Sequence, residues 1–141
     1  EMGTDLLSFD AYQMSLMPKG YAASVAKFID SGGIICWGIV PTDSDNLRKQ
    51  TPESLAGLLV EYWKVVAENT GLPLKLIAEH SLIAPARCCL KNIGQVGASD
   101  DAKPGKIGHV DFSVEELLVE KAFGYLNQIS KILRNEFNLH Q

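Results

Sequence analysis

Apolar and polar residues alternate in blocks along the chain, and the blocks predict strands and helices in turn. Short apolar runs bounded by Asp, Gly or Pro predict strands near residues 5–9, 34–40 and 74–79. Apolar positions at helical spacing predict helices near residues 20–31, 52–70 and 113–137. Regular alternation of this kind predicts parallel strands joined by right-handed crossovers. The predicted fold class is α/β, with three βα units in one domain.

Local signals mark the helix ends. Thr51 and Pro52 are typical of an N-cap and a first helical position. Ser113 with Glu116 has the capping-box form that opens the last helix. A polar loop at residues 94–111 is long enough for a lid or an inserted excursion.

Three βα units leave two open sheet edges, and parallel strands expect cover on both faces. The apolar run at residues 34–40 favours a strand covered on both sides. A closed eight-stranded barrel takes about 250 residues, so this chain could supply about three of its eight units. We therefore expect a second copy or another polypeptide to cover the edges, unless the chain is a piece of something larger.

The composition and charge limit the classes of partner and the cellular compartment that we expect for this chain. The chain is 46% hydrophobic and 21% charged, which is ordinary globular usage. A net charge of -4 with scattered basic residues argues against nucleic acid, and no apolar run approaches the ~20 residues that a membrane span needs. Three cysteines without a secretory leader favour a reducing, cytoplasmic compartment.

Candidate chemistry gathers at the carboxyl ends of parallel strands. Asp10 ends the first predicted strand, where it is a candidate metal ligand or general base, with a turn cap as the alternative. Cys88 and Cys89 follow the third, where a thiolate could bind zinc or a thiol could pack. Cys36, inside the second strand, is expected to pack.

Weaker candidates for substrate binding are Trp37, His80 and Ser81. His80 and Ser81 are expected just after the third strand, where His80 is either an acid, base or ligand, or a histidine satisfied by a backbone carbonyl. Trp37 either stacks on a planar ligand or belongs to the core. His109 and His140 are expected to be solvated.

Three segments resemble the carboxyl-terminal part of the cobalamin-independent methionine synthase family, within the uroporphyrinogen decarboxylase and methionine synthase barrel superfamily. They are DLLSFD at residues 5–10, GIICWGIVP at 33–41 and PARCCLK at 85–91. They look like the family's sixth and seventh strands and the segment after the eighth. The resemblance covers roughly residues 4–92 and the final helix, and it implies the last part of a TIM (β/α)8 barrel.

The resemblance also implies a zinc ion held by His, Cys, an acidic residue and a second Cys, which binds the thiol of homocysteine. The acidic ligand would be Asp10, and the second Cys would be Cys88. Aligning the segment on its proline instead would place Arg87 at the position of the zinc-binding cysteine. We prefer the alignment that places Cys88 there, because it also matches Leu90 and Lys91. The family's His and first Cys come from an earlier strand outside this sequence. The methyl donor would be 5-methyltetrahydrofolate or a corrinoid.

The leading hypothesis is therefore the carboxyl-terminal part of a zinc-dependent methyltransferase that acts on a thiol, truncated or working with a missing half. One alternative is a non-catalytic, barrel-derived domain that forms a homodimer, or that binds a partner or small ligand through its strand edges. A second alternative is a uroporphyrinogen decarboxylase-like enzyme, although the chain lacks the basic cluster that a polycarboxylate substrate favours.

Overall fold

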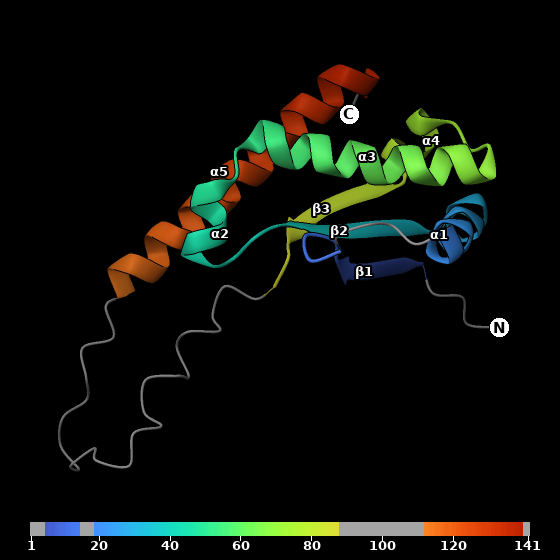
Figure 1. The fold of residues 1–141 in the computed structure, drawn as a ribbon. Helices are drawn as coiled ribbons and strands as arrows, with labels where there is room; N and C mark the ends of the chain where they lie inside the picture. The colour runs from blue at the N-terminus through green and yellow to red at the C-terminus, as the bar shows by residue number, and fades with distance from the viewer. Residues whose placement is uncertain (1–4, 15–18, 88–111, 140–141) are drawn as a thin grey trace, which may run out of the picture.

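The computed structural model describes residues 5–14, 19–87 and 112–139 (Figure 1). Within these ranges, three strands and five helices follow one another along the chain. They are β1 (Leu6–Asp10), α1 (Lys19–Asp30), β2 (Ile34–Val40), α2 (Ser44–Lys49), α3 (Pro52–Thr70), α4 (Leu74–Glu79), β3 (Ser81–Pro85) and α5 (Phe112–Phe137). None of these helices is long and apolar enough to cross a membrane.

The three strands form one open, parallel sheet in the order β1-β2-β3. Leu6 pairs with Ile34 at the amino end of the sheet, and Asp10 pairs with Gly38 at its carboxyl end. The α/β class with three parallel strands is confirmed. The first two strands and the three long helices lie where the sequence predicts them, within one residue at their ends.

The prediction of a strand at residues 74–79 is wrong. These residues form the short helix α4, and the third strand is Ser81–Pro85. Apolar runs this short suit either structure, and here Ile77 and Ala78 are buried together on one side of a helical turn. As a consequence His80 precedes β3 and Ser81 begins it, so both lie at the amino end of the sheet, opposite the end that the sequence assigned to them.

A short helix, α2, was not predicted. Asp43 caps it, because its Oδ1 accepts the Asn46 N–H at 2.8 Å. The side-chain and backbone hydrogen bonds from Asn46 hold the pKa of Asp43 below its ordinary value. The predicted loop at residues 94–111 lies outside the described residues, as do Cys88, Cys89, His109 and His140.

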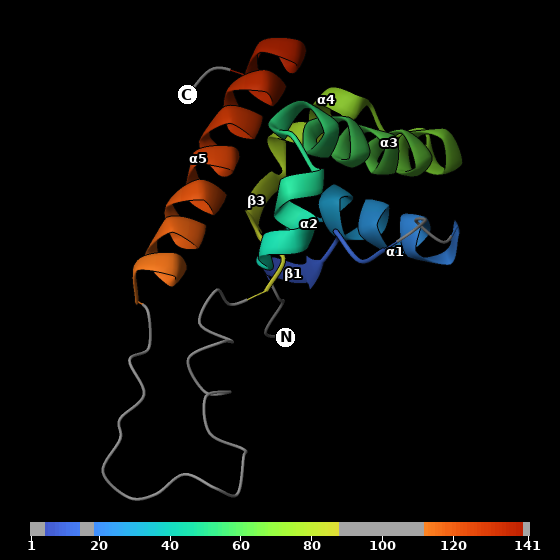
Figure 2. The ribbon, with the colours of Figure 1, turned by 60° about the vertical axis from the view of Figure 1, so that its left-hand side comes forward.

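One face of the sheet is covered by helices. The side chains of Ile35, Trp37 and Ile39 point to this face and are fully buried. Figure 2 shows α1 and α3 to the right of the strands and α5 running along β3 on the left, and α3 packs against both other helices. Aromatic rings link the layers, with Trp37 at 5.1 Å from Phe9 and 6.5 Å from Trp63 between ring centroids.

The other face of the sheet is bare over the described residues. Alternation along the strands places Leu6, Ile34 and Leu82 on it, and these side chains are 50%, 39% and 51% exposed. Cys36 is half-buried beside Leu82, its partner in register. No described residue covers this second face of β2, so the expectation that both faces are covered stays a prediction.

Candidate functional site at the carboxyl edge of the sheet

Asp10 is the last residue of β1 and points across the carboxyl edge of the sheet. Its Oδ2 accepts a hydrogen bond from Arg87 Nε at 3.2 Å, and its Oδ1 accepts one from the Gln13 N–H at 3.1 Å. A second guanidinium nitrogen of Arg87 donates to Gln13 Oε1. Asp10 thus caps a turn, as the alternative reading held, and it also joins the ends of β1 and β3 through an ion pair.

The backbone brings these side chains together over the end of β2. The N–H groups of Ala11 and Tyr12 both donate to the Gly38 carbonyl at 3.0 Å, and the Ala86 N–H donates to the Val40 carbonyl at 2.7 Å. A Cβ added at Gly38 would lie 2.9 Å from the Phe9 oxygen. The segments that leave β1 and β3 therefore close over Gly38, because that residue has no side chain.

Polar side chains hold the segment after β1 against the helices. Gln50 Nε2 donates to the Tyr12 hydroxyl at 3.4 Å, and the Tyr125 hydroxyl donates to the Gln50 carbonyl at 2.9 Å. The Tyr62 hydroxyl donates to the Met14 carbonyl. Burial raises the pKa of Tyr62, and the negative charge of Asp10 raises it further. These contacts hold the segment after β1, and with it Asp10, in place against the helices.

The other predicted substrate-binding residues lie away from this edge. The Ser81 hydroxyl donates to the Ile77 carbonyl at 2.7 Å and accepts the Trp37 indole N–H at 2.9 Å. His80 Nδ1 contacts the Gly33 carbonyl at 3.0 Å, which is the satisfied-histidine alternative. Trp37 belongs to the core. The structure thus does not bring these three residues together with Asp10.

The described residues do not by themselves fit a zinc ion. Within them no group of three or more His, Cys, Asp or Glu side chains is close enough to hold a metal. Asp10 is the one predicted ligand that they include, and its carboxylate is bonded to a guanidinium. Cys88 lies outside the described residues, directly after Arg87 in the sequence.

Sequence reasoning found Asp10 but missed its partner Gln13. Aspartate side chains commonly accept a nearby backbone N–H in turns, so the turn cap at Asp10 could be predicted but the identity of its donor could not. The chain matches no protein-family model, no curated protein and no solved structure. The resemblance to the methionine synthases therefore stays a prediction.

Proposed function

We propose that this chain supplies three consecutive βα units of a methionine-synthase-like methyltransferase barrel, with the edge around Asp10 turned toward the substrate. One observation carries the proposal: α1, α3 and α5 pack against the strands and one another, while Leu6, Ile34 and Leu82 are exposed on a face of the sheet that no described residue covers. The strand order β1-β2-β3 follows the sequence.

When the strand order of a parallel sheet follows the sequence, the connecting helices all fall on one side of the sheet. The other face is then buried only when the strands close into a barrel. In a doubly wound sheet, by contrast, helices cover both faces. The bare, apolar face of this sheet has the character of a barrel interior, which branched apolar side chains fill in layers.

The open edge at β1 supports the same proposal. An apolar cavity of about 470 Å³ lies between β1 and α1, lined by residues that include Leu7, Phe9, Val25 and Phe28. Leu7 and Tyr21 are exposed there. In a barrel, a preceding βα unit packs at this position, against both the strand edge and the helix.

At the carboxyl edge, Arg87 has a defined part in the proposed reaction. Methyl transfer to a thiol requires the thiolate, and an adjacent guanidinium favours a thiolate over the neutral thiol. Asp10 and Gln13 hold the Arg87 side chain at this edge. We assign the substrate to a small thiol such as homocysteine and the compartment to the cytoplasm, and we derive no step through zinc.

A methyl-transfer assay on the full gene product tests the proposal. Homocysteine is supplied with 5-methyltetrahydrofolate or methylcobalamin, and methionine is measured by mass spectrometry. Asp10→Ala and Arg87→Gln should lose at least tenfold in rate. Asp30→Asn, an exposed carboxylate at the end of α1, should keep it. Equal rates in all variants, or no methionine with either donor, would refute the proposed activity.

Metal analysis of the same proteins tests the ligand assignment separately. Zinc per chain is measured for the full gene product and for its Asp10→Ala and Cys88→Ser variants. Less zinc in both variants would support Asp10 and Cys88 as zinc ligands. Undiminished zinc in both variants would refute this assignment, whatever the assay for methyl transfer shows.

Self-association is the second candidate function, because the exposed apolar side chains of the bare face offer a surface on which two copies could meet. Two copies could cover each other through Leu6, Ile34 and Leu82. Light scattering of the chain and of its Leu82→Lys variant tests this. A dimer that the lysine dissociates would support self-association, whereas a monomer at all concentrations would refute it.

A further inference from the structure

The two outer strands of the sheet differ in how their free edges are protected. In a parallel ladder, alternate residues of an outer strand point their N–H and C=O groups away from the sheet. These groups can pair with another strand, and proteins usually block such an edge with a proline, a charge, a bulge or a covering helix. Over the described residues, β3 has protection of this kind, whereas β1 has little.

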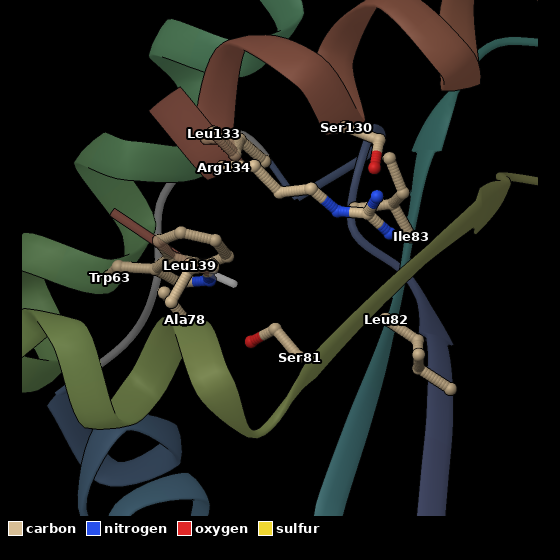
Figure 3. Close-up of a pocket in the computed structure, with 9 residues that line it drawn as sticks. All are labelled: Trp63, Ala78, Ser81, Leu82, Ile83, Ser130, Leu133, Arg134 and Leu139. Atoms are coloured by element: carbon tan, nitrogen blue, oxygen red, sulfur yellow. The ribbon is translucent and has the colours of Figure 1, made fainter. Parts of the chain in front are cut away.

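The free edge of β3 is protected by a proline and by α5. Backbone hydrogen bonds join His80 and Ala86 to β2, so alternation leaves the intervening residues facing away from it: Ser81, Ile83 and Pro85. Pro85 has no N–H to donate to a further strand. Helix α5 packs against β3, and Figure 3 shows the guanidinium of Arg134, from this helix, beside Ile83. A further strand at β3 would therefore meet a missing donor and a neighbouring helix.

The free edge of β1 is open over the described residues. The Ile34 N–H donates to the Asp5 carbonyl at 2.9 Å, and the Ala11 N–H donates to the Gly38 carbonyl at 3.0 Å. Alternation between these two bonds leaves three residues facing away from β2: Leu6, Ser8 and Asp10. The strand contains no proline, its only charge is at its carboxyl end, and its register with β2 runs without a bulge. Its outward N–H and C=O groups are therefore available to another strand.

The side chains beside this edge are apolar and exposed. Leu7 and Phe9 line the cavity of about 470 Å³ between β1 and α1, and Leu7 is 42% exposed. On the opposite face of the strand, Leu6 is 50% exposed. A strand added at this edge places every second side chain over the cavity and the others beside Leu6, because side chains alternate between the two faces. Both sets of side chains then lie against apolar surface.

We propose that the free edge of β1 binds an extended apolar segment as a fourth strand, with alternate side chains of that segment filling the cavity beside α1. Backbone hydrogen bonds to Leu6, Ser8 and Asp10 provide affinity, and the cavity selects the apolar side chains. In the proposed barrel this segment is the preceding strand, so the assignment rests on the proposed function. The open backbone groups of β1 require a strand at this position, because a helix uses its own N–H and C=O groups internally.

Nitrogen-15 NMR of the 141-residue chain tests strand addition without methyl transfer. The probe is a synthetic peptide of five valines flanked by lysines, with N-methyl groups on alternate valines. These methyl groups leave the peptide one hydrogen-bonding edge, so that it can pair with β1 but cannot form fibres.

The amide signals of Leu6, Ser8 and Asp10 should shift saturably at high peptide concentration, because a free peptide loses its own freedom on binding. The Ile83 amide signal, at the protected edge, should stay nearly fixed. The same peptide methylated on all five valines keeps its charge but has no N–H group left on the valines, and it should not bind. Equal binding of the two peptides, or no shift at β1, would overturn the proposal.

Two positions on α1 separate the cavity from its surroundings. Ser24 is exposed and lines the cavity, so Ser24→Phe should fill it and weaken peptide binding about tenfold. Ala23 is exposed but is not among the lining residues, so Ala23→Phe is the matched control and should bind as the parent does. Equal affinities for these two variants would overturn the role of the cavity. Peptide binding by a protein without methyl-transfer activity would refute the proposed activity alone, whereas an active protein that does not bind the peptide would refute strand addition alone.

Discussion

Replacing Gly38 by alanine tests the close packing that brings Asp10 and Arg87 together. The new Cβ would lie 2.9 Å from the Phe9 oxygen, 3.0 Å from the Ala86 Cα and 3.2 Å from the Pro85 oxygen. All three are backbone atoms, so no side-chain rotation relieves the contact. Overpacking of this kind typically costs about 1–3 kcal/mol, and with three backbone contacts we expect about 2–3 kcal/mol.

Gly57→Ala is the matched control. Gly57 lies inside α3, and an added Cβ meets nothing within 4 Å. Alanine in place of glycine should therefore stabilise the protein by about 0.5–1 kcal/mol. Both variants restrict the unfolded chain in the same way, so the difference between them isolates the contact at Gly38.

Urea unfolding followed by tryptophan fluorescence measures both free energies by linear extrapolation. Opposite signs are expected, with Gly38→Ala less stable than the parent and Gly57→Ala more stable. If Gly38→Ala is as stable as the parent, the segments after β1 and β3 do not close over Gly38 as described. The geometric basis for pairing Asp10 with Arg87 would then be lost.

Three further predictions concern individual side chains. Arg87→Gln should change the free energy of unfolding by at most about 1 kcal/mol, because the two partners are 46% and 25% exposed, and a loss above 2 kcal/mol in urea would contradict this. Thr51→Ala removes the acceptor of the Ser54 N–H and should cost about 1 kcal/mol, or roughly 3 °C in a thermal scan, which Thr51→Ser should largely restore. The pKa of Asp43 is lower in the folded state than its ordinary value of 3.8, so the ionised side chain stabilises the protein when the pH is above 3.8. This stability is lost as the pH falls through the lower folded pKa. Asp43→Ala should therefore flatten the acid side of a plot of unfolding free energy against pH.

Elements with their own local signals were predictable from the sequence. The helix α3 has its cap at Thr51, a proline at Pro52 and a left-handed glycine at its end, Gly71, so both boundaries follow from neighbouring residues. The strand β2 is a long apolar run closed by a proline. In these cases local preference and tertiary packing agree.

The segment from Leu74 to Pro85 was not predictable in the same way. It holds two short apolar runs, LKLIA and SLIAP, and either could pair with β2. The choice depends on long-range packing, because Ile77 is buried as part of a helix while Ile83 lies opposite Trp37 in the sheet. The local pattern of apolar residues is compatible with a helix or a strand for both runs, so it does not distinguish them.

The candidate site shows the same division. Asp10 at a strand end was predicted, since strand ends gather chemistry in parallel sheets. Its pairing with Arg87 spans 77 residues and depends on β1 and β3 flanking β2. Arg87 lies near Asp10 because the third strand is Ser81–Pro85 and ends just before it. The sequence placed this strand at residues 74–79, so the contact between Asp10 and Arg87 could not be predicted.

The energetics of the bare face bear on how a barrel would be completed. Fully burying a leucine or isoleucine side chain is worth about 1.5–3 kcal/mol, so covering Leu6, Ile34 and Leu82 from half-exposure gains roughly 3 kcal/mol. Association of separate molecules costs about 4–15 kcal/mol in lost freedom, so these contacts alone do not hold a free partner. A βα unit joined through the same polypeptide avoids most of that cost and also pairs the backbone of the β1 edge. The bare face therefore favours completion by a covalently linked segment over association with a second copy.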